Sequence, residues 1–293
     1  MNDQVDSAFE RNRQRLFGLG YRMLGSRAEA EDLVQDAYVR WHQADHAAIR
    51  NAEAWLVTTA TRLAIDRLRA LKTEREAYVG PWLPEPMMAD STPPPDRHLE
   101  LASDLSIAFL VLLERLGPEE RAAFLLHDVF EFEYREIAGV LERNEDACRQ
   151  IVHRARTRIR TERKRFDVTD AAKAQLLRKF TDAVNAGDQQ TLVDLFAPDA
   201  TWTADGGGRA GAGTRPIIGN ENIARLVMGL RPRLHGDAST MELIDVNGET
   251  GLCVRTDGRI TAVISISTDG EHIHAAYAVV NPAKLGTDAR PDR

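Results

Sequence analysis

The sequence predicts a multidomain protein with two all-α helical domains, the second carrying a helix-turn-helix, followed by an α+β domain. Three observations predict this class. Apolar residues recur at spacings of three and four through residues 7–79 and again through residues 104–165. A proline-rich stretch separates these two helical parts. Beyond residue 167 arginine becomes less frequent, glycine becomes more frequent, and β-branched residues begin to alternate along short runs.

Composition narrows the class of protein. The 293 residues are 43% hydrophobic and 28% charged, which is typical of a folded chain of two or three domains. No apolar run approaches the ~18–20 residues that cross a bilayer, and the N-terminus lacks the apolar segment of a secretory signal. Cys148 and Cys253 lie in segments of different character, so no disulfide framework is expected. We therefore expect a cytoplasmic protein without a membrane partner.

The net charge of −7 hides a strong asymmetry. Residues 104–148 carry eleven acids and four bases, whereas residues 149–165 carry eight bases and a single acid, Glu162. Such a concentrated cationic strip indicates a polyanionic partner. The alternative is a solvated helix face that the preceding acidic segment balances.

The first part of the chain predicts three helices. The first runs from Ser7 to Leu24 and ends at Gly25, a residue suited to a left-handed cap. Ser26 caps the second helix, and the third runs from about Asn51 past Arg75. Polar residues fill the loop at 42–50. Three aromatic residues fall on the apolar stripes and are expected in the core, namely Tyr38, Trp41 and Trp55.

Residues 80–97 contain six of the twelve prolines and predict an extended linker. Trp82 is unusual in a spacer, so we expect it to dock. Helical periodicity then predicts segments at 99–116, 119–130, 133–142 and 145–165. In the last segment we expect Asn144 to be the N-cap. Opposite its basic outer face lies a predicted apolar stripe of Cys148, Ile151, Val152, Ala155 and Ile159. Two helices joined by a short turn, the second basic, are typical of a helix-turn-helix.

The C-terminal part predicts helices at 169–186, 188–196 and about 220–230. Strand-like runs follow at 239–246, 251–256, 259–267 and 272–280, separated by hairpin-type turns. We expect them to form a curved antiparallel sheet in an α+β domain.

Two blocks resemble a known family. Residues 26–41 (SRAEAEDLVQDAYVRW) and 54–69 (AWLVTTATRLAIDRLR) resemble the second conserved region of extracytoplasmic-function sigma factors of bacterial RNA polymerase, and residues 118–160 resemble the fourth. The remainder resembles a SnoaL-type domain with the cone of the ketosteroid-isomerase fold. WLPEP at 82–86, DGGGR at 205–209 and NPAKL at 281–285 resemble signatures of the SigJ-like subgroup, which carries this extension. The chain departs from the family at Glu142, where a glycine is usual.

The resemblance implies four segments: sigma region 2 at 1–79, the linker at 80–103, sigma region 4 at 104–167, and a SnoaL-like regulatory domain at 168–293. It implies a promoter-specificity subunit that binds the polymerase core and promoter DNA, is a monomer when free, and is modulated in cis by its extension. The surface expected to bind the core comprises Asp32, Leu33, Gln35 and Asp36.

Promoter contacts are expected from both helical domains. For the upstream element, Arg149 and Gln150 have forked ends that match guanine and adenine edges, and later cations suit phosphates. The full upstream set is Arg149, Gln150, His153, Arg154, Arg156 and Arg160. For the downstream element, we expect a mixed-charge helix face and the 42–50 loop to contribute Arg62, Asp66, Arg69, His46, Arg50 and Asn51.

We expect the linker to dock on the C-terminal domain, with the DGGGR segment forming part of its seat. The residues assigned to this interdomain, regulatory contact are Trp82, Leu83, Pro84, Asp205, Gly206, Gly207, Gly208, Arg209, Asn281, Pro282, Lys284 and Leu285. The alternative is a loose linker beside a flexible loop.

Two other functions remain open from the sequence. One is a ligand-responsive helix-turn-helix regulator that acts without being a polymerase subunit. The other is an isomerase-like enzyme, for which Asp205, His272, His274 and Tyr277 are the titratable groups near the expected cavity. We expect no enzyme, no catalytic residue, no cofactor and no metal, because fold likeness alone does not establish catalysis. A small-molecule ligand in the C-terminal domain stays open.

Overall fold

The computed structural model describes residues 2–88, 105–162, 168–208, 212–234 and 239–286. The chain divides into two compact units, one formed by residues 1–76 and 110–164 and the other by residues 77–109 and 165–293. The two predicted helical domains thus fall in one unit, and the linker groups with the C-terminal domain. None of the described helices has the length and apolar character needed to cross a membrane.

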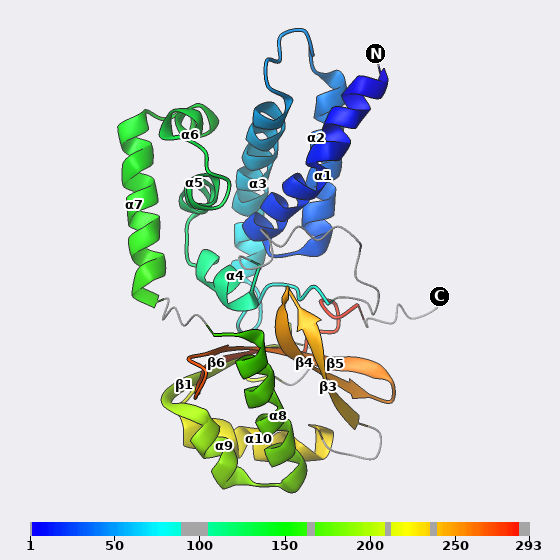
Figure 1. Ribbon diagram of the computed structural model, residues 1–293, viewed down its shortest axis with the longest axis vertical. Helices are drawn as coiled ribbons and strands as arrows, with labels where there is room; N and C mark the ends of the chain where they lie inside the picture. Colours follow the sequence, from blue (N-terminus) through cyan, green and yellow to red (C-terminus); the bar gives the residue numbers. More distant parts are fainter. Residues whose placement is uncertain (1, 89–104, 163–167, 209–211, 235–238, 287–293) are drawn as a thin grey trace. The chain divides into compact units, whose positions relative to one another are not determined.

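The helical unit begins with three long helices (Figure 1), α1 (Asn2–Leu24), α2 (Arg27–Gln43) and α3 (Ala52–Glu76). Gly25 has a φ of 67° and closes α1, as predicted. The Ser26 side chain accepts a hydrogen bond from the Glu29 amide and caps α2. Trp41 is buried and its indole donates to the Val5 carbonyl, whereas Tyr38 and Trp55 are only partly buried.

Four further helices follow: α4 (Ile107–Leu113), α5 (Pro118–Asp128), α6 (Tyr134–Leu141) and α7 (Glu145–Glu162). α5 packs against α7, α6, α3 and α1, so both helical parts share one core. Arg121 is buried at this junction, where its guanidinium donates to the Met23 carbonyl and to Glu114. A buried guanidinium that meets an acid and a carbonyl avoids the cost of an unpaired charge.

The turn between α6 and α7 contains an unusual backbone conformation. Glu142, the residue at which the sequence departs from the pattern it resembles, adopts left-handed dihedrals, with φ 55° and ψ 44°. An L-residue pays about 1 kcal/mol or more for this conformation. The helix-turn-helix is nevertheless formed, because the amides of Glu142 and Arg143 both donate to the Ala138 carbonyl.

In the second unit, a six-stranded sheet has the order β2-β1-β6-β5-β4-β3. The strands are β1 (Phe196–Asp205), β2 (Ile217–Ile218), β3 (Ser239–Val246), β4 (Glu249–Thr256), β5 (Arg259–Thr268) and β6 (Ile273–Val279). The expectation of an antiparallel sheet is wrong in one respect: β1 pairs with β6 in parallel. β1 itself is not in the sequence prediction, because Pro198 and a register shift between Phe196 and Thr201 interrupt its alternation.

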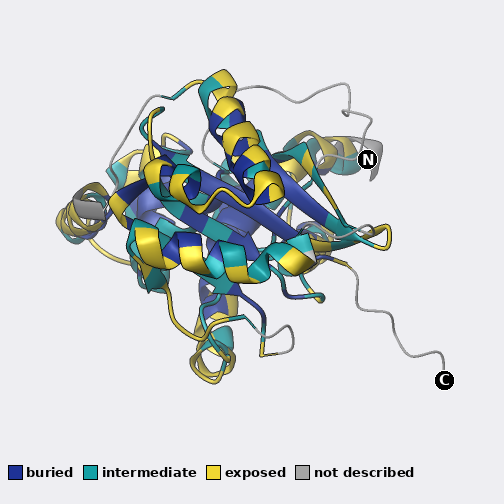
Figure 2. Ribbon diagram, turned by 90° about the horizontal axis from the view of Figure 1, so that it is seen from below, coloured by how far each residue is buried: buried dark blue, intermediate teal, exposed yellow. Residues whose placement is uncertain are grey.

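Three helices pack on this sheet: α8 (Asp170–Ala186), α9 (Gln189–Leu195) and α10 (Asn220–Leu234). Their inner sides are buried and their outer sides exposed (Figure 2). Phe180, Phe196 and Trp202 form the aromatic centre of the core, with ring centroids 6.3–6.5 Å apart. The concave sheet with helices on one side positions the end of β1, where the linker contacts described below occur.

Candidate nucleic-acid interface and linker seat

Helix α7 has a buried apolar stripe on one face and exposed polar side chains on the opposite face. Its inward residues are those that the periodicity predicts, namely Cys148, Ile151, Val152, Ala155 and Ile159. Asn144 caps the helix by accepting from the Ala147 amide at 2.8 Å. Burial raises the pKa of the Cys148 thiol, which behaves as a small apolar group. The stripe fixes the rotation of α7, and the side chains between its members point outward.

The outward residues of α7 fall into two groups. Arg149, Gln150, His153, Arg154 and Arg160 are exposed. Arg156 is only half exposed, because its guanidinium forms hydrogen bonds of 2.6–3.0 Å with both carboxylate oxygens of Asp128 in α5. This hydrogen bonding with Asp128 raises the pKa of Arg156. Arg156 therefore fastens α7 to α5, which argues against the expected phosphate contact.

Glu120 in α5 draws two further arginines of α7. Arg158 donates to its carboxylate at 2.8 Å, and Arg154 forms an ion pair at 4.0 Å. The acidic segment before α7 thus balances part of the basic strip, as the alternative interpretation predicts. Gln150, His153 and Arg160 are exposed, and Arg149 pairs instead with Glu145 and Asp146 of its own helix.

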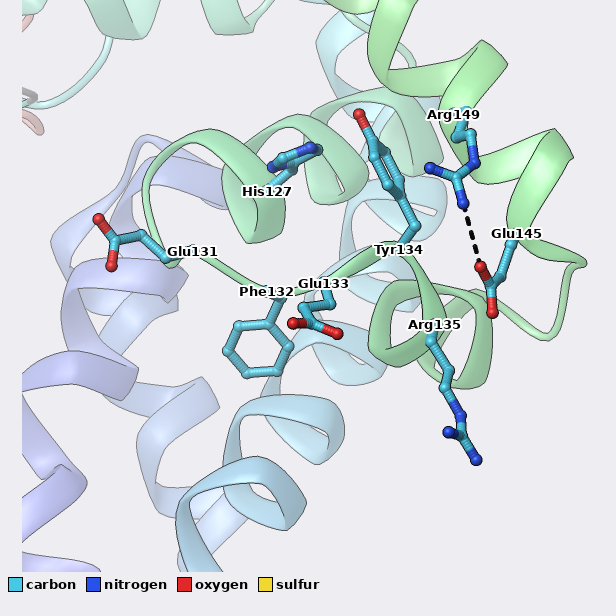
Figure 3. A pocket seen from close by; sticks show the side chains of 8 residues that line it. All are labelled: His127, Glu131, Phe132, Glu133, Tyr134, Arg135, Glu145 and Arg149. Carbon is cyan, nitrogen blue, oxygen red and sulfur yellow. Dashed lines mark hydrogen bonds and ion pairs between the residues drawn. The ribbon is translucent and has the colours of Figure 1, made fainter.

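A hollow of about 560 Å³ lies at the N-terminal end of α7 (Figure 3). Within it the Arg149 guanidinium carbon stands 4.6 Å from the centroid of the Tyr134 ring. Glu145 accepts from Arg149 at 3.2 Å. The His127 ring meets Tyr134 edge-on at 4.4 Å. The sequence prediction misses Tyr134 and His127, although an aromatic residue at the start of the first helix of a helix-turn-helix was available as a signal.

On the expected downstream face of α3, two arginines reach across to α5 and α6. Arg62 donates to the backbone carbonyls of Val140 and Gly139 at 3.0 and 2.9 Å, and pairs with Glu142 at 3.1 Å. Arg69 bonds to Asp66 at 3.3 Å and to Glu119 at 2.8 Å. Both arginines therefore pair with carbonyls or acids of the same unit while Arg62, Asp66 and Arg69 all remain exposed, and their assignment to the downstream element stays a prediction.

The 42–50 loop also differs from expectation. The His46 ring packs against Trp41 at 4.4 Å, and its buried Nδ1 atom has no hydrogen-bond partner among the described residues. Asn51 caps α3 by accepting from the Ala54 amide at 3.1 Å, so its polar end serves the helix. Arg50 is exposed. Arg50 and Asn51 are thus both exposed, whereas His46 is partly buried.

Three of the four residues expected to bind the polymerase core lie on the surface of α2. Asp32, Gln35 and Asp36 are exposed on one side of the helix. Leu33 is 4% exposed and belongs to the core of the three-helix part, so its assignment to a binding surface is wrong. The apolar stripe that includes Leu33 already indicates this placement.

Within the C-terminal unit, the linker docks on a seat formed by residues 205–208 and 281–285, which we call the linker seat. Asp205 is completely buried at its centre. The Tyr78 hydroxyl and the Leu83 amide donate to its carboxylate at 2.5 and 2.8 Å, and Lys284 pairs with it at 2.7 Å. The Gly207 amide adds a fourth donor at 3.1 Å. These partners compensate the burial of the charge.

Aromatic contacts complete the linker seat. The Lys284 ammonium lies 3.9 Å from the Trp82 ring centroid and also donates to the Leu83 carbonyl. Leu83, Pro84 and Gly206 are buried, as are Asn281 and Leu285, whereas Trp82 and Pro282 are partly buried. The expected docking is thus present in the geometry, with Leu83 rather than Trp82 as the deepest residue. Arg209 lies outside the described residues.

Tyr78 is a seat residue that the sequence prediction misses. Its hydroxyl also accepts a hydrogen bond from Asn281 at 2.8 Å. Burial and then the hydrogen bond with Asp205 raise the pKa of Tyr78, so the phenol stays protonated and donates. A second linker contact follows at Met87, whose amide donates to the Asn247 side chain at 2.8 Å. Neither residue carries a local sequence signal, since both are defined by partners far along the chain.

Of the two histidines named above, His274 lies in β6 and His272 directly precedes that strand. His274 pairs with Asp269 at 2.7 Å. Burial alone would raise the pKa of Asp269, but hydrogen bonds from the His272 backbone amide and the His274 ring lower it overall. Among the described residues, no group of three potential ligands could hold a metal ion.

Family comparison accounts for both units. Residues 8–74 match the Sigma-70 region 2 model, residues 106–159 the Sigma-70 region 4 model, and residues 177–281 the SnoaL-like domain model. The ECF RNA polymerase sigma factor SigJ of Mycobacterium tuberculosis is 37% identical over 293 residues, which span 95% of this chain and 92% of the relative. The chain belongs to the ECF RNA polymerase sigma factors.

A solved structure of SigJ and one further relative agree with this family. The crystal structure of M. tuberculosis SigJ matches the fold with a TM-score of 0.77 at 35% identity, and the match covers 96% of this chain and 98% of that one. The probable ECF sigma factor SigI of M. tuberculosis is 29% identical over 286 residues, which span 97% of this chain and 96% of the relative.

A sigma factor binds RNA polymerase core and promoter DNA and directs transcription initiation, and this chain has that function with a SnoaL-like domain attached. Sigma factors are not enzymes. The comparisons give no support for a small-molecule ligand in the SnoaL-like domain.

Proposed function

We propose that α7 is the element of this sigma factor that reads the upstream promoter element. The observation that carries the proposal is the exposed polar row of Arg149, Gln150 and His153 above a fully buried stripe. A helix with its N-terminal residues free for base edges and later cations free for phosphates suits the major groove. In this assignment Arg160, which is exposed, contacts the DNA backbone, in the cytoplasm where polymerase acts.

The test is promoter binding by the holoenzyme at a series of salt concentrations. Replacing Arg160 with glutamine should weaken binding to all sequences alike and reduce the slope of log affinity against log salt by about one. Arg156→Gln, the matched change one turn earlier, should leave the slope unchanged, because Arg156 is committed to Asp128. Equal slopes for both variants and the unaltered chain would remove α7 from the DNA interface.

We further propose that Asp32, Gln35 and Asp36 on α2 contact the polymerase core. Their exposure along one side of α2, next to a buried stripe, supports this role. Asp36→Arg should reduce holoenzyme assembly in a core-binding assay without changing thermal stability. Glu31→Arg, another exposed acid of the same helix, is the matched control for charge.

The linker seat supports modulation in cis. Residues 78–87 are held against the C-terminal domain by the buried carboxylate of Asp205 and, at Met87, by the Asn247 side chain. We propose that the C-terminal domain modulates transcription in cis through this docking of the linker. Run-off transcription with Trp82→Ala and Leu83→Ala, compared with the unaltered chain, tests this directly: unchanged transcript yield and unchanged protection of residues 78–87 from hydrogen exchange would contradict it.

A further inference from the structure

The Arg149 side chain is held on two sides in the free protein. We infer that Tyr134 and Glu145 are positioning residues that present the Arg149 guanidinium to a base edge, and that they thereby set the base preference at one position of the upstream element. The inference rests on the proposed role of α7.

Contacts from two helices define the position of Arg149. Tyr134 is the first residue of α6, and its ring centroid lies 4.6 Å from the guanidinium carbon, within the range of a cation–π interaction. Glu145 lies one turn before Arg149 on α7 and accepts a hydrogen bond from its Nη2 atom at 3.2 Å. Asp146 adds a looser ion pair at 3.9 Å.

Tyr134 is itself fixed from a third helix. The His127 ring, at the end of α5, meets it edge-on with an interplanar angle of 88° and a centroid separation of 4.4 Å. Figure 3 shows His127, Tyr134 and Arg149 in succession, with Glu145 on the far side of the guanidinium. The tyrosine ring therefore forms a supported wall on which Arg149 rests.

The arrangement leaves Arg149 chemically able to read a base. A guanidinium has five N–H donors, and a bidentate contact to guanine needs two of them. Glu145 takes one. A long side chain that is already held in one conformation loses less entropy on binding than a mobile one. Arg154, Arg156 and Arg158 form ion pairs with Glu120 or Asp128 of α5. Arg149 instead contacts Tyr134 and Glu145, at the N-terminal end of α7.

The experiment is selection of promoter DNA from a randomised duplex pool by holoenzyme formed from the full chain and polymerase core, followed by sequencing. Arg149→Ala should reduce the preference for guanine at one position about five- to hundredfold. Tyr134→Leu should reduce the preference at that position about two- to fivefold, and Tyr134→Phe should retain it. Combining Tyr134→Leu with Arg149→Ala should add nothing to the effect of Arg149→Ala.

Glu145→Gln separates positioning from overall charge. Removing a carboxylate from the DNA side should raise the affinity for all DNA, while the preference at the Arg149 position falls. Glu76→Gln, in the exposed i,i+4 pair with Lys72 on α3, is the matched control and should leave the preference unchanged. If Glu145 had only a structural role, Glu145→Gln would not raise the overall affinity for DNA while lowering the base preference at the Arg149 position.

The outcomes distinguish the inference from the function on which it rests. If Arg149→Ala changes no position of the selected consensus, the proposed role of Arg149 fails and the inference fails with it. If Arg149→Ala acts but Tyr134→Leu leaves the preference intact, or the two effects add in the double variant, the proposed function stands and positioning by Tyr134 is overturned. Melting temperatures of all variants exclude misfolding as the cause.

Discussion

Arg62 of α3 donates two hydrogen bonds to the last carbonyls of α6, those of Gly139 and Val140, and its guanidinium pairs with Glu142 in the turn that follows. Cationic side chains near a helix C-terminus satisfy carbonyls that lack partners within the helix. The contact therefore joins the first helical part of the unit to the helix-turn-helix.

Arg62→Met should loosen this junction. Charged hydrogen bonds to carbonyls contribute about 1–2 kcal/mol, so the amides of α6 should exchange with deuterium about five- to thirtyfold faster in the full chain. Hydrogen exchange with mass spectrometry measures this change. Arg40→Met, an exposed arginine of α2, is the control and should have no effect. Unchanged α6 exchange in Arg62→Met would show that the contact stabilises nothing.

The buried pair in the linker seat should respond unequally to the loss of its two members. Asp205→Asn leaves the Lys284 ammonium, whose side chain is 12% exposed, without its carboxylate and should cost about 3–5 kcal/mol. Lys284→Met should cost less, because Tyr78, Leu83 and Gly207 still donate to Asp205. Calorimetric melting measures both. Equal losses, or a double variant less stable than the sum of the single ones, would refute the coupling.

Gly207 and Gly258 offer a matched pair for the seat's close packing. Both have positive φ values, 58° and 75°, so alanine strains the backbone at each by about 1 kcal/mol. A Cβ at Gly207 would also lie 2.5 Å from the Asn281 Nδ2 atom, whereas nothing lies within 4 Å at Gly258. Gly207→Ala should therefore lower the melting temperature further than Gly258→Ala does. Equal shifts would mean that Asn281 moves aside freely.

The Asp269–His274 pair predicts a pH dependence. Because the folded pKa of Asp269 lies below its unfolded value of about 3.9, the carboxylate stabilises the fold above that pH, and the contribution is lost as the pH falls toward the folded pKa. Asp269→Asn should thus be less stable than the unaltered chain at pH 7, with a difference that narrows below about pH 4. A difference that stays constant on acidification would contradict this assignment.

Local sequence patterns predict the helices and the hairpins well. The apolar stripe of α7 is predicted residue by residue, because a helix buried on one side shows its period of 3.6 directly. β3 is predicted with the bounds that the structure gives. β1 is missed because Pro198 interrupts its pattern and because its partner in the parallel pair, β6, lies some 70 residues onward.

The site residues divide along the same line. The outward position of Arg149 and the linker contact of Asp205 depend on element faces and motifs, and both lie as the sequence predicts. The partners of Arg62, Arg69 and Arg156 depend instead on which helices pack together. The local sequence does not distinguish an arginine that is hydrogen-bonded to another helix from one that is surrounded by solvent. Tyr78 and Tyr134 are missed for this reason too, since each is defined by a ring contact or hydrogen bond across the fold.

The left-handed backbone of Glu142 links local strain to the packing of whole helices. A glycine there would relax the turn, but it would have no carboxylate to reach Arg62. The glutamate side chain thus makes the left-handed backbone less stable, but it also forms the ion pair that offsets this strain. When α3 moves away from the helix-turn-helix, the backbone strain at Glu142 remains, but the ion pair with Arg62 is lost. If α3 and the helix-turn-helix separate, the turn is consequently less stable than it is in the packed unit. The conformation of this turn therefore depends on whether α3 is packed against it.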